Sequence, residues 1–108
     1  MIWMPQEGFA TALSQHASPE RAALLAATQR PIAVACIQER APRPAWKVEP
    51  SRYLLAEEDR MINPATQLFM AQRIGARIRS EKVDHTPLVS APEPVIEVIP
   101  DAVASLAA

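Results

Sequence analysis

From residue 50 onward, segments with the pattern of strands alternate with segments with the pattern of helices, and this order restricts the folds open to the chain. A short apolar run between Pro50 and an acidic cluster is typical of a buried strand, and a more charged run follows the first helix. Strands that alternate with helices pair in parallel through right-handed crossovers. We therefore expect an α/β sheet with strands at 51–57 and 77–83 and helices at 64–75 and 94–108.

Residues at the ends of these segments support the assignment. Asn63 followed by Pro64 is typical of a helix N-cap and first position, and Gly75 of a helix end. Pro100 is expected to kink the last helix or to split it in two. Two parallel strands alone leave both sheet edges unpaired, so this region reads as part of a larger sheet.

The first part of the chain has a different character. Residues 1–45 read as helical and irregular, with Ser18 and Pro19 at the start of a helix that Pro31 ends. A short helix is expected at 32–39, and the proline-rich segment 41–46 is expected to be extended or turned. The sequence thus divides into residues 1–45 and residues 46–108.

Two residues capable of acid–base chemistry follow the two strands. Asp59 comes after the first strand and His85, 26 positions later, after the second. The carboxyl ends of neighbouring parallel strands meet at one edge of a sheet, which is where α/β proteins place their sites. A carboxylate there can orient a histidine ring and fix its tautomer. The alternative is that Asp59 only caps the following helix and His85 is a surface loop residue.

The chain resembles the C-terminal part of α/β-hydrolase-fold proteins, within the esterase-like branch of plant methylesterases and hydroxynitrile lyases. The resemblance rests on AWKVEPSRYLLAEEDRMINPATQLFMAQRIGA and VDHTPLVSAPEPVIEVI, and on WMPQEGFA and TQRPIA in the first part. It implies that Asp59 is the triad acid, that His85 is the triad base and that residues 1–45 form a helical lid over a substrate pocket. The implied substrate is a small carboxylic ester.

The nucleophile of such a triad is missing from these 108 residues. It stands on a G-x-S-x-G elbow between a strand and a helix. The chain has only Gly8 and Gly75, and Ser14 and Ser18 lie in the lid-like segment rather than on a strand-to-helix turn. The oxyanion donors that accompany the nucleophile are missing as well. We therefore do not expect the chain by itself to hydrolyse esters by the family mechanism.

Composition excludes several other functions. A net charge of -1 gives no electrostatic reason to expect nucleic acid or an anionic membrane as partner. No cluster has metal-ligand spacing and no glycine-rich loop suits a phosphate, so no metal or cofactor is expected. Neither a spanning segment nor a signal peptide is recognisable, and a lone Cys36 forms no internal disulfide. By default we expect a cytoplasmic protein.

The remaining side chains are given simpler interpretations. His16 is expected to be a solvated surface residue and Cys36 a small buried one. Asp84, directly before His85, is expected either to raise the pKa of that histidine or to compete with Asp59 for its ring N–H. Four large apolar side chains are equally compatible with a substrate pocket and with ordinary core packing: Trp3, Phe9, Leu13 and Trp46.

Three functions remain open. The chain is the C-terminal part of an ester hydrolase whose nucleophile lies on another segment, or a catalytically inactive remnant that acts as a binding module, or a small independent α/β protein. Isolated, its apolar faces lack partners, so we expect marginal stability and self-association, or pairing with a homologue through the open sheet edge. These faces carry Leu54, Leu55, Leu68, Phe69, Val95 and Val98.

Overall fold

The computed structural model describes residues 1–106, so the ends of the expected last helix and of the 46–108 region, Ala107 and Ala108, lie outside the described residues. Its centre is a two-stranded sheet in which β1 (Arg52–Ala56) and β2 (Arg77–Glu81) pair in parallel. Arg52 lies opposite Arg77 and Ala56 opposite Glu81. The predicted mixed α/β class, with two parallel strands joined through a helix, is confirmed.

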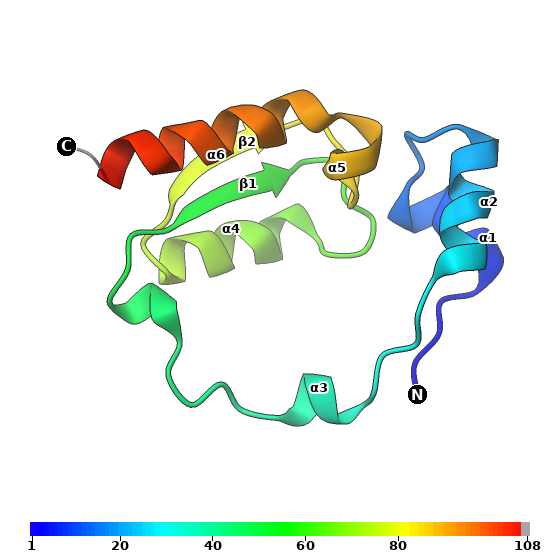
Figure 1. Ribbon diagram of the computed structural model, residues 1–108, viewed down its shortest axis with the longest axis horizontal. Helices are drawn as coiled ribbons and strands as arrows, with labels where there is room; N and C mark the ends of the chain where they lie inside the picture. The colour runs from blue at the N-terminus through cyan, green and yellow to red at the C-terminus, as the bar shows by residue number, and fades with distance from the viewer. Residues whose placement is uncertain (107–108) are drawn as a thin grey trace.

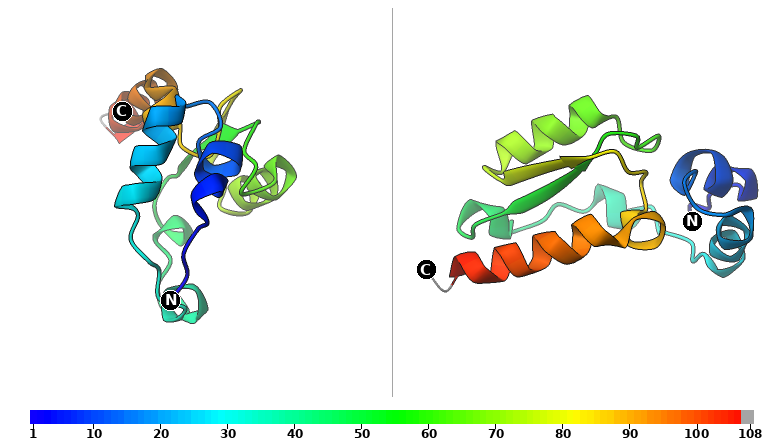
Figure 2. Two further views of the ribbon diagram at one scale, coloured as in Figure 1. Left: turned by 90° about the vertical axis from the view of Figure 1, so that its right-hand side faces the viewer. Right: turned by 90° about the horizontal axis from the view of Figure 1, so that it is seen from above.

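Helices lie on both faces of the sheet. Figures 1 and 2 show α4 (Pro64–Arg73) on one face and α6 (Pro92–Leu106) on the other, with the short α5 (Pro87–Ser90) next to the ends of the strands. The small core between β1, α4 and the end of β2 includes Leu55, Ala71 and Val83, each at most 6% exposed. The opposite face, towards α6, holds ion pairs: Arg52 with Asp101, and Arg79 with Glu97.

The ends of α4 follow the sequence. The Asn63 side chain accepts a hydrogen bond from the Ala65 N–H, and Gly75 follows the helix with φ 64°, a conformation that favours glycine. Of the two effects expected of Pro100, a kink or a split, the split is wrong, because α6 is one helix with Pro100 inside it. Pro100 leaves the carbonyl of Ile96 without its helical donor. Both residues are exposed, so water can bond that carbonyl.

The N-terminal segment, residues 1–28, is a separate helical unit. It comprises α1 (Gln6–Gly8), a π-helical turn η1 (Phe9–Leu13) and α2 (Pro19–Thr28), which pack on one another. Ser18 caps α2 as predicted, accepting from the Arg21 N–H. Figures 1 and 2 place this segment beyond the carboxyl ends of the strands.

The connection from the N-terminal segment to β1 is an open arc. It contains α3 (Ala35–Gln38), which is shorter than the expected helix at 32–39, and a 3₁₀ turn η2 (Ala45–Lys47) (Figure 1). Ile2 and Ile32 form an isolated antiparallel bridge at its start. The prediction that Cys36 is buried is wrong, because all four residues of α3 are exposed.

Much apolar surface of the sheet region is exposed. Of the six residues expected to lack partners, Leu55 is buried, whereas Leu68 is 41% and Phe69 63% exposed. None of the residues of α6 is buried. Its outer face carries what we call the α6 stripe, at helical spacing: Ile96, Ile99, Val103 and Leu106, each at least 60% exposed. Within residues 1–106, no helix has the length and apolar character needed to cross a bilayer.

Candidate acid–base site

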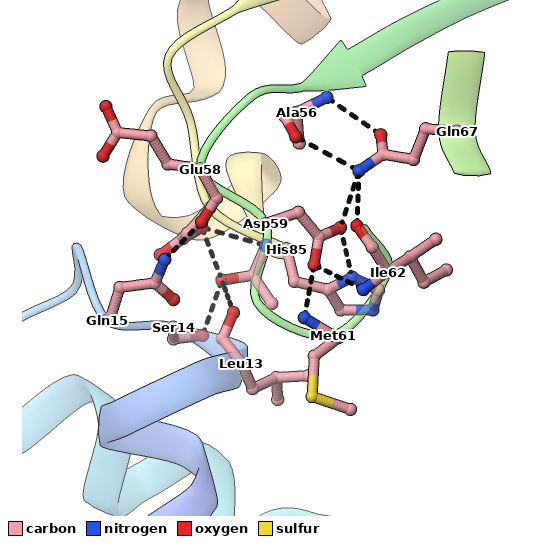
Figure 3. Close-up of polar contacts among 12 residues, drawn as sticks. Leu13, Ser14, Gln15, Ala56, Glu58, Asp59, Met61, Ile62, Gln67 and His85 are labelled. Atoms are coloured by element: carbon pink, nitrogen blue, oxygen red, sulfur yellow. Dashed lines mark hydrogen bonds and ion pairs between the residues drawn. The ribbon is translucent and has the colours of Figure 1, made fainter. Parts of the chain in front are cut away.

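The loops that follow the two parallel strands bring Asp59 and His85 together. Asp59 lies three residues beyond the end of β1 and His85 four beyond the end of β2. Asp59 Oδ2 is 2.8 Å from His85 Nδ1, and Figure 3 shows the two side chains pointing toward each other. Parallel pairing explains this contact, because it aligns the carboxyl ends of both strands at one edge.

The carboxylate of Asp59 is held from several sides. Its Oδ1 accepts the backbone N–H groups of Met61 and Ile62 at 2.7 and 2.9 Å. Its side chain is only 5% exposed. The helix cap itself is Asn63, so Asp59 orders the loop before α4 and uses its second oxygen for His85. Asp59 therefore does more than cap a helix.

This arrangement sets the tautomer of His85. A carboxylate only accepts hydrogen bonds, so Nδ1 carries the proton that is shared with Asp59. Among the residues the structure describes, none hydrogen-bonds Nε2. The side chain is 31% exposed. The ring thus leaves Nε2 available for a further hydrogen bond, while Asp59 holds Nδ1.

Gln67 of α4 supports the acid loop, by which we mean residues 57–63 between β1 and α4, which carry Asp59. Gln67 was not singled out by the sequence. Its side chain donates from Nε2 to the carbonyls of Ala56 and Ile62 and, at 3.3 Å, to Asp59 Oδ2, while its Oε1 accepts the Ala56 N–H (Figure 3). Gln67 is 3% exposed. The next residue, Glu57, bonds β2 through its N–H, so Ala56 turns its own backbone groups to the outer edge of β1, where Gln67 pairs with them.

A largely apolar cavity of about 520 Å³ opens beside the histidine. Four large apolar residues are compatible from the sequence with either a substrate pocket or core packing. Three of them, Trp3, Phe9 and Leu13, line this cavity together with His85. Trp46 does not belong to it, because it lies at the far end of α4 with the Arg73 guanidinium 5.9 Å from its ring centre. The remaining walls are Ile2, Met4, Pro5, Gln29, Arg30, Ile32 and Met61.

Asp84 does not contact the ring of His85, so the predicted competition with Asp59 is wrong. It is completely buried and accepts hydrogen bonds from the backbone or side chains of His16, Thr86 and Ser90. Burial by itself raises the pKa of this carboxyl, but the bonds from Ser90, His16 and Thr86 together outweigh burial and hold the pKa below its ordinary value.

His16 is exposed, as predicted for a surface residue, and its ring is paired with a carboxylate. Its Nε2 lies 2.9 Å from the Glu58 carboxylate, and its side chain is 32% exposed. Sequence reasoning gave no sign of the His16–Glu58 pair, because 42 positions separate its members.

Burial raises the pKa of the Tyr53 hydroxyl on β1, and the negative charge of Asp59 raises it further.

The two serines considered as nucleophiles both have structural roles. Ser14 is fully buried with its hydroxyl against that of Thr86, and Ser18 caps α2. Within residues 1–106, His85 makes no hydrogen bond to a serine, and no group of three or more His, Cys, Asp or Glu side chains is placed to hold a metal ion. The geometry therefore offers an acid–base pair beside an apolar cavity.

Comparison with known proteins adds no family assignment to this geometry. No protein-family model, curated protein or solved structure matches the chain.

Proposed function

We propose that the chain is the acid–base part of a carboxylic ester hydrolase of the α/β-hydrolase type, with Asp59 as the triad acid and His85 as the base. The observation that carries this proposal is the 2.8 Å contact between Asp59 Oδ2 and His85 Nδ1 beyond two parallel strands. A cavity that reaches the same histidine supports it. The resemblance of the surrounding sequence to esterase-like hydrolases agrees with this geometry.

In this function His85 acts through Nε2. A serine hydroxyl gives its proton to Nε2 as its oxygen attacks the ester carbonyl, and the imidazolium then returns the proton to the departing alcohol. Asp59 keeps the ring in the required tautomer throughout. The nucleophile and the oxyanion donors come from a separate segment, since no G-x-S-x-G elbow occurs in the 108 residues. Each oxyanion donor is worth about 10²–10³ in rate.

The lining of the cavity suggests the kind of ester. Trp3, Phe9 and Leu13 surround the space next to His85 with apolar surface. An apolar acyl or alcohol group of a small ester fits such a wall, because its burial is favoured by about 25 cal/mol per Å². We therefore expect 4-nitrophenyl butyrate to be a better substrate than 4-nitrophenyl acetate.

The test is to restore the missing part. The DNA upstream of the Met1 codon is translated in all frames, and any strand–G-x-S-x-G–helix segment found there is joined to the chain. The chain alone should not turn over 4-nitrophenyl butyrate above background, and the restored protein should. His85→Ala should lower kcat at least about 10³-fold.

A matched control separates this site from general damage. His16→Ala removes the other histidine of the chain, which lies in the N-terminal segment, and should leave kcat nearly unchanged. Turnover that persists in the restored protein after His85→Ala would contradict the proposal. So would an upstream region that encodes no nucleophile segment.

The second candidate function, a binding module without catalysis, is favoured by one observation. The α6 stripe is exposed, and within the described residues both β1 and β2 have an open edge. Such surfaces suit association with a homologue or with a second copy. Concentration-dependent association with no catalytic gain from an upstream segment would favour this function over the first.

A further inference from the structure

A second buried carboxylate lies directly beside the candidate base. Asp84 precedes His85 and is 0% exposed, and the acid–base pair makes no use of it. A buried carboxylate is costly unless its oxygens are hydrogen-bonded. Four hydrogen-bond donors offset this cost at Asp84.

The two oxygens of Asp84 bond different parts of the chain. Oδ1 accepts from the Thr86 N–H at 2.9 Å, the Thr86 hydroxyl at 3.2 Å and the Ser90 hydroxyl at 2.7 Å. The bond to the Thr86 N–H closes a turn in which His85 is the central residue. Oδ2 accepts from the backbone N–H of His16 at 3.0 Å, across 68 positions of sequence.

The bond to His16 belongs to a set of polar contacts that hold residues 11–16 against the strand-end loops. Gln15 Nε2 donates to the Glu58 carbonyl at 2.6 Å, and the Arg60 guanidinium donates to the Thr11 carbonyl at 2.8 Å. The same stretch of chain contributes Leu13 to the cavity beside His85. Asp84 bonds both the turn of the histidine and this wall of the cavity, and Thr86 of the same turn also contacts the Ser14 hydroxyl and the Leu13 carbonyl.

We propose that Asp84 is a positioning residue that couples the orientation of His85 to the closure of the cavity wall. One oxygen fixes the turn that directs the imidazole at Asp59, and the other holds the backbone N–H of His16. This assignment rests on the proposed function only in naming His85 as the base. Its tests measure amide exchange and a histidine N–H signal and require no hydrolysis of a substrate. Failure of this proposal is therefore distinguishable from failure of the hydrolase proposal.

The first test uses backbone amide exchange in the wild-type chain, followed by NMR. The amides of His16 and Thr86 bond to the same carboxylate, so one opening event should release both, and their protection factors should agree within about threefold. Widely different protection of the two amides would overturn the coupling.

Two substitutions then separate the two oxygens. In Asp84→Asn the amide oxygen takes the place of Oδ1, which has three donors, and the NH₂ group faces His16 and cannot accept. The His16 amide should exchange at least about tenfold faster while Thr86 changes little, and the hydrogen-bonded Nδ1–H signal of His85 should persist. Asp84→Ala should release both amides and abolish that signal.

The control is His16→Ala, which keeps the backbone N–H that donates to Asp84 and removes only the ring that bonds Glu58. Protection at position 16 should then stay within about threefold of wild type. If Asp84→Ala does not fold, the proposal is decided by Asp84→Asn and by the comparison of His16 and Thr86 protection in wild type. Equal acceleration of both amides in Asp84→Asn, or acceleration of neither, would overturn the proposal.

Discussion

Replacing Gln67 with methionine tests the support of the acid loop. Methionine has a similar volume but cannot pair with the backbone N–H and C=O of Ala56, which lie at the outer edge of β1 and are buried, Ala56 being 6% exposed. Leaving a buried polar group unpaired costs about 1–3 kcal/mol. The two groups of Ala56 together should therefore lower the free energy of unfolding by about 2–6 kcal/mol. The bonds to the Ile62 carbonyl and to Asp59 Oδ2 are only partly buried, so their loss adds less.

Urea unfolding followed by circular dichroism measures this effect, and Gln72→Met is the matched control. Gln72 lies on the same helix but is exposed, so the same substitution should change stability by no more than about 0.5 kcal/mol. Glutamine and methionine have similar helix propensities, which leaves burial as the difference between the two positions. A cost below about 1 kcal/mol for Gln67→Met would refute the claim that this side chain satisfies the buried backbone groups of Ala56.

Three further predictions concern stability and association. The pKa of Asp84 is lowered in the folded chain, so its contribution to stability is fully present above its unfolded pKa of about 3.9 and is lost as pH falls through the folded pKa. When stability is measured against pH, wild type should therefore lose stability more steeply below about pH 4 than Asp84→Asn. Gly75→Ala should cost about 1 kcal/mol because φ is +64° there, whereas Gly8→Ala, at φ -63° and against the flexible end of Met4, should be close to neutral in the same melts; equal costs would contradict the backbone argument. Ile99→Lys, in the middle of the α6 stripe, should reduce self-association in sedimentation velocity without lowering stability by more than about 0.5 kcal/mol; unchanged association would place the contact elsewhere.

The features predicted correctly from the sequence are those set by local chemistry or by topology. Asn63 and Gly75 mark the ends of α4 because capping depends on a few neighbouring residues. Asp59 and His85 meet because parallel strands align their carboxyl ends, whatever the details of packing. Both inferences require only the order of the elements and the residues at their boundaries.

The features that the sequence did not predict depend on contacts between distant parts of the chain. Gln67 and Gln72 are the same residue type on the same helix, and only the position of β1 makes the first a buried partner of Ala56 and leaves the second a solvated side chain. Asp84 binds a backbone group 68 positions away, which no local pattern indicates. Cys36 stands in an apolar run that reads as buried, yet it is exposed, as are the other residues of α3.

The most direct test of the central claim is the tautomer of His85, read from the long-range ¹H–¹⁵N spectrum of histidine-labelled chain above the pH at which the ring is protonated. Wild type should show a protonated Nδ1 and a bare Nε2, because Nδ1 donates to Asp59. In Asp59→Asn the amide oxygen should take over the backbone donors Met61 and Ile62 from Oδ1 and turn the NH₂ group to the ring, so the proton should move to Nε2. The same tautomer in both proteins would contradict the assignment of Asp59 and His85 as an acid–base pair.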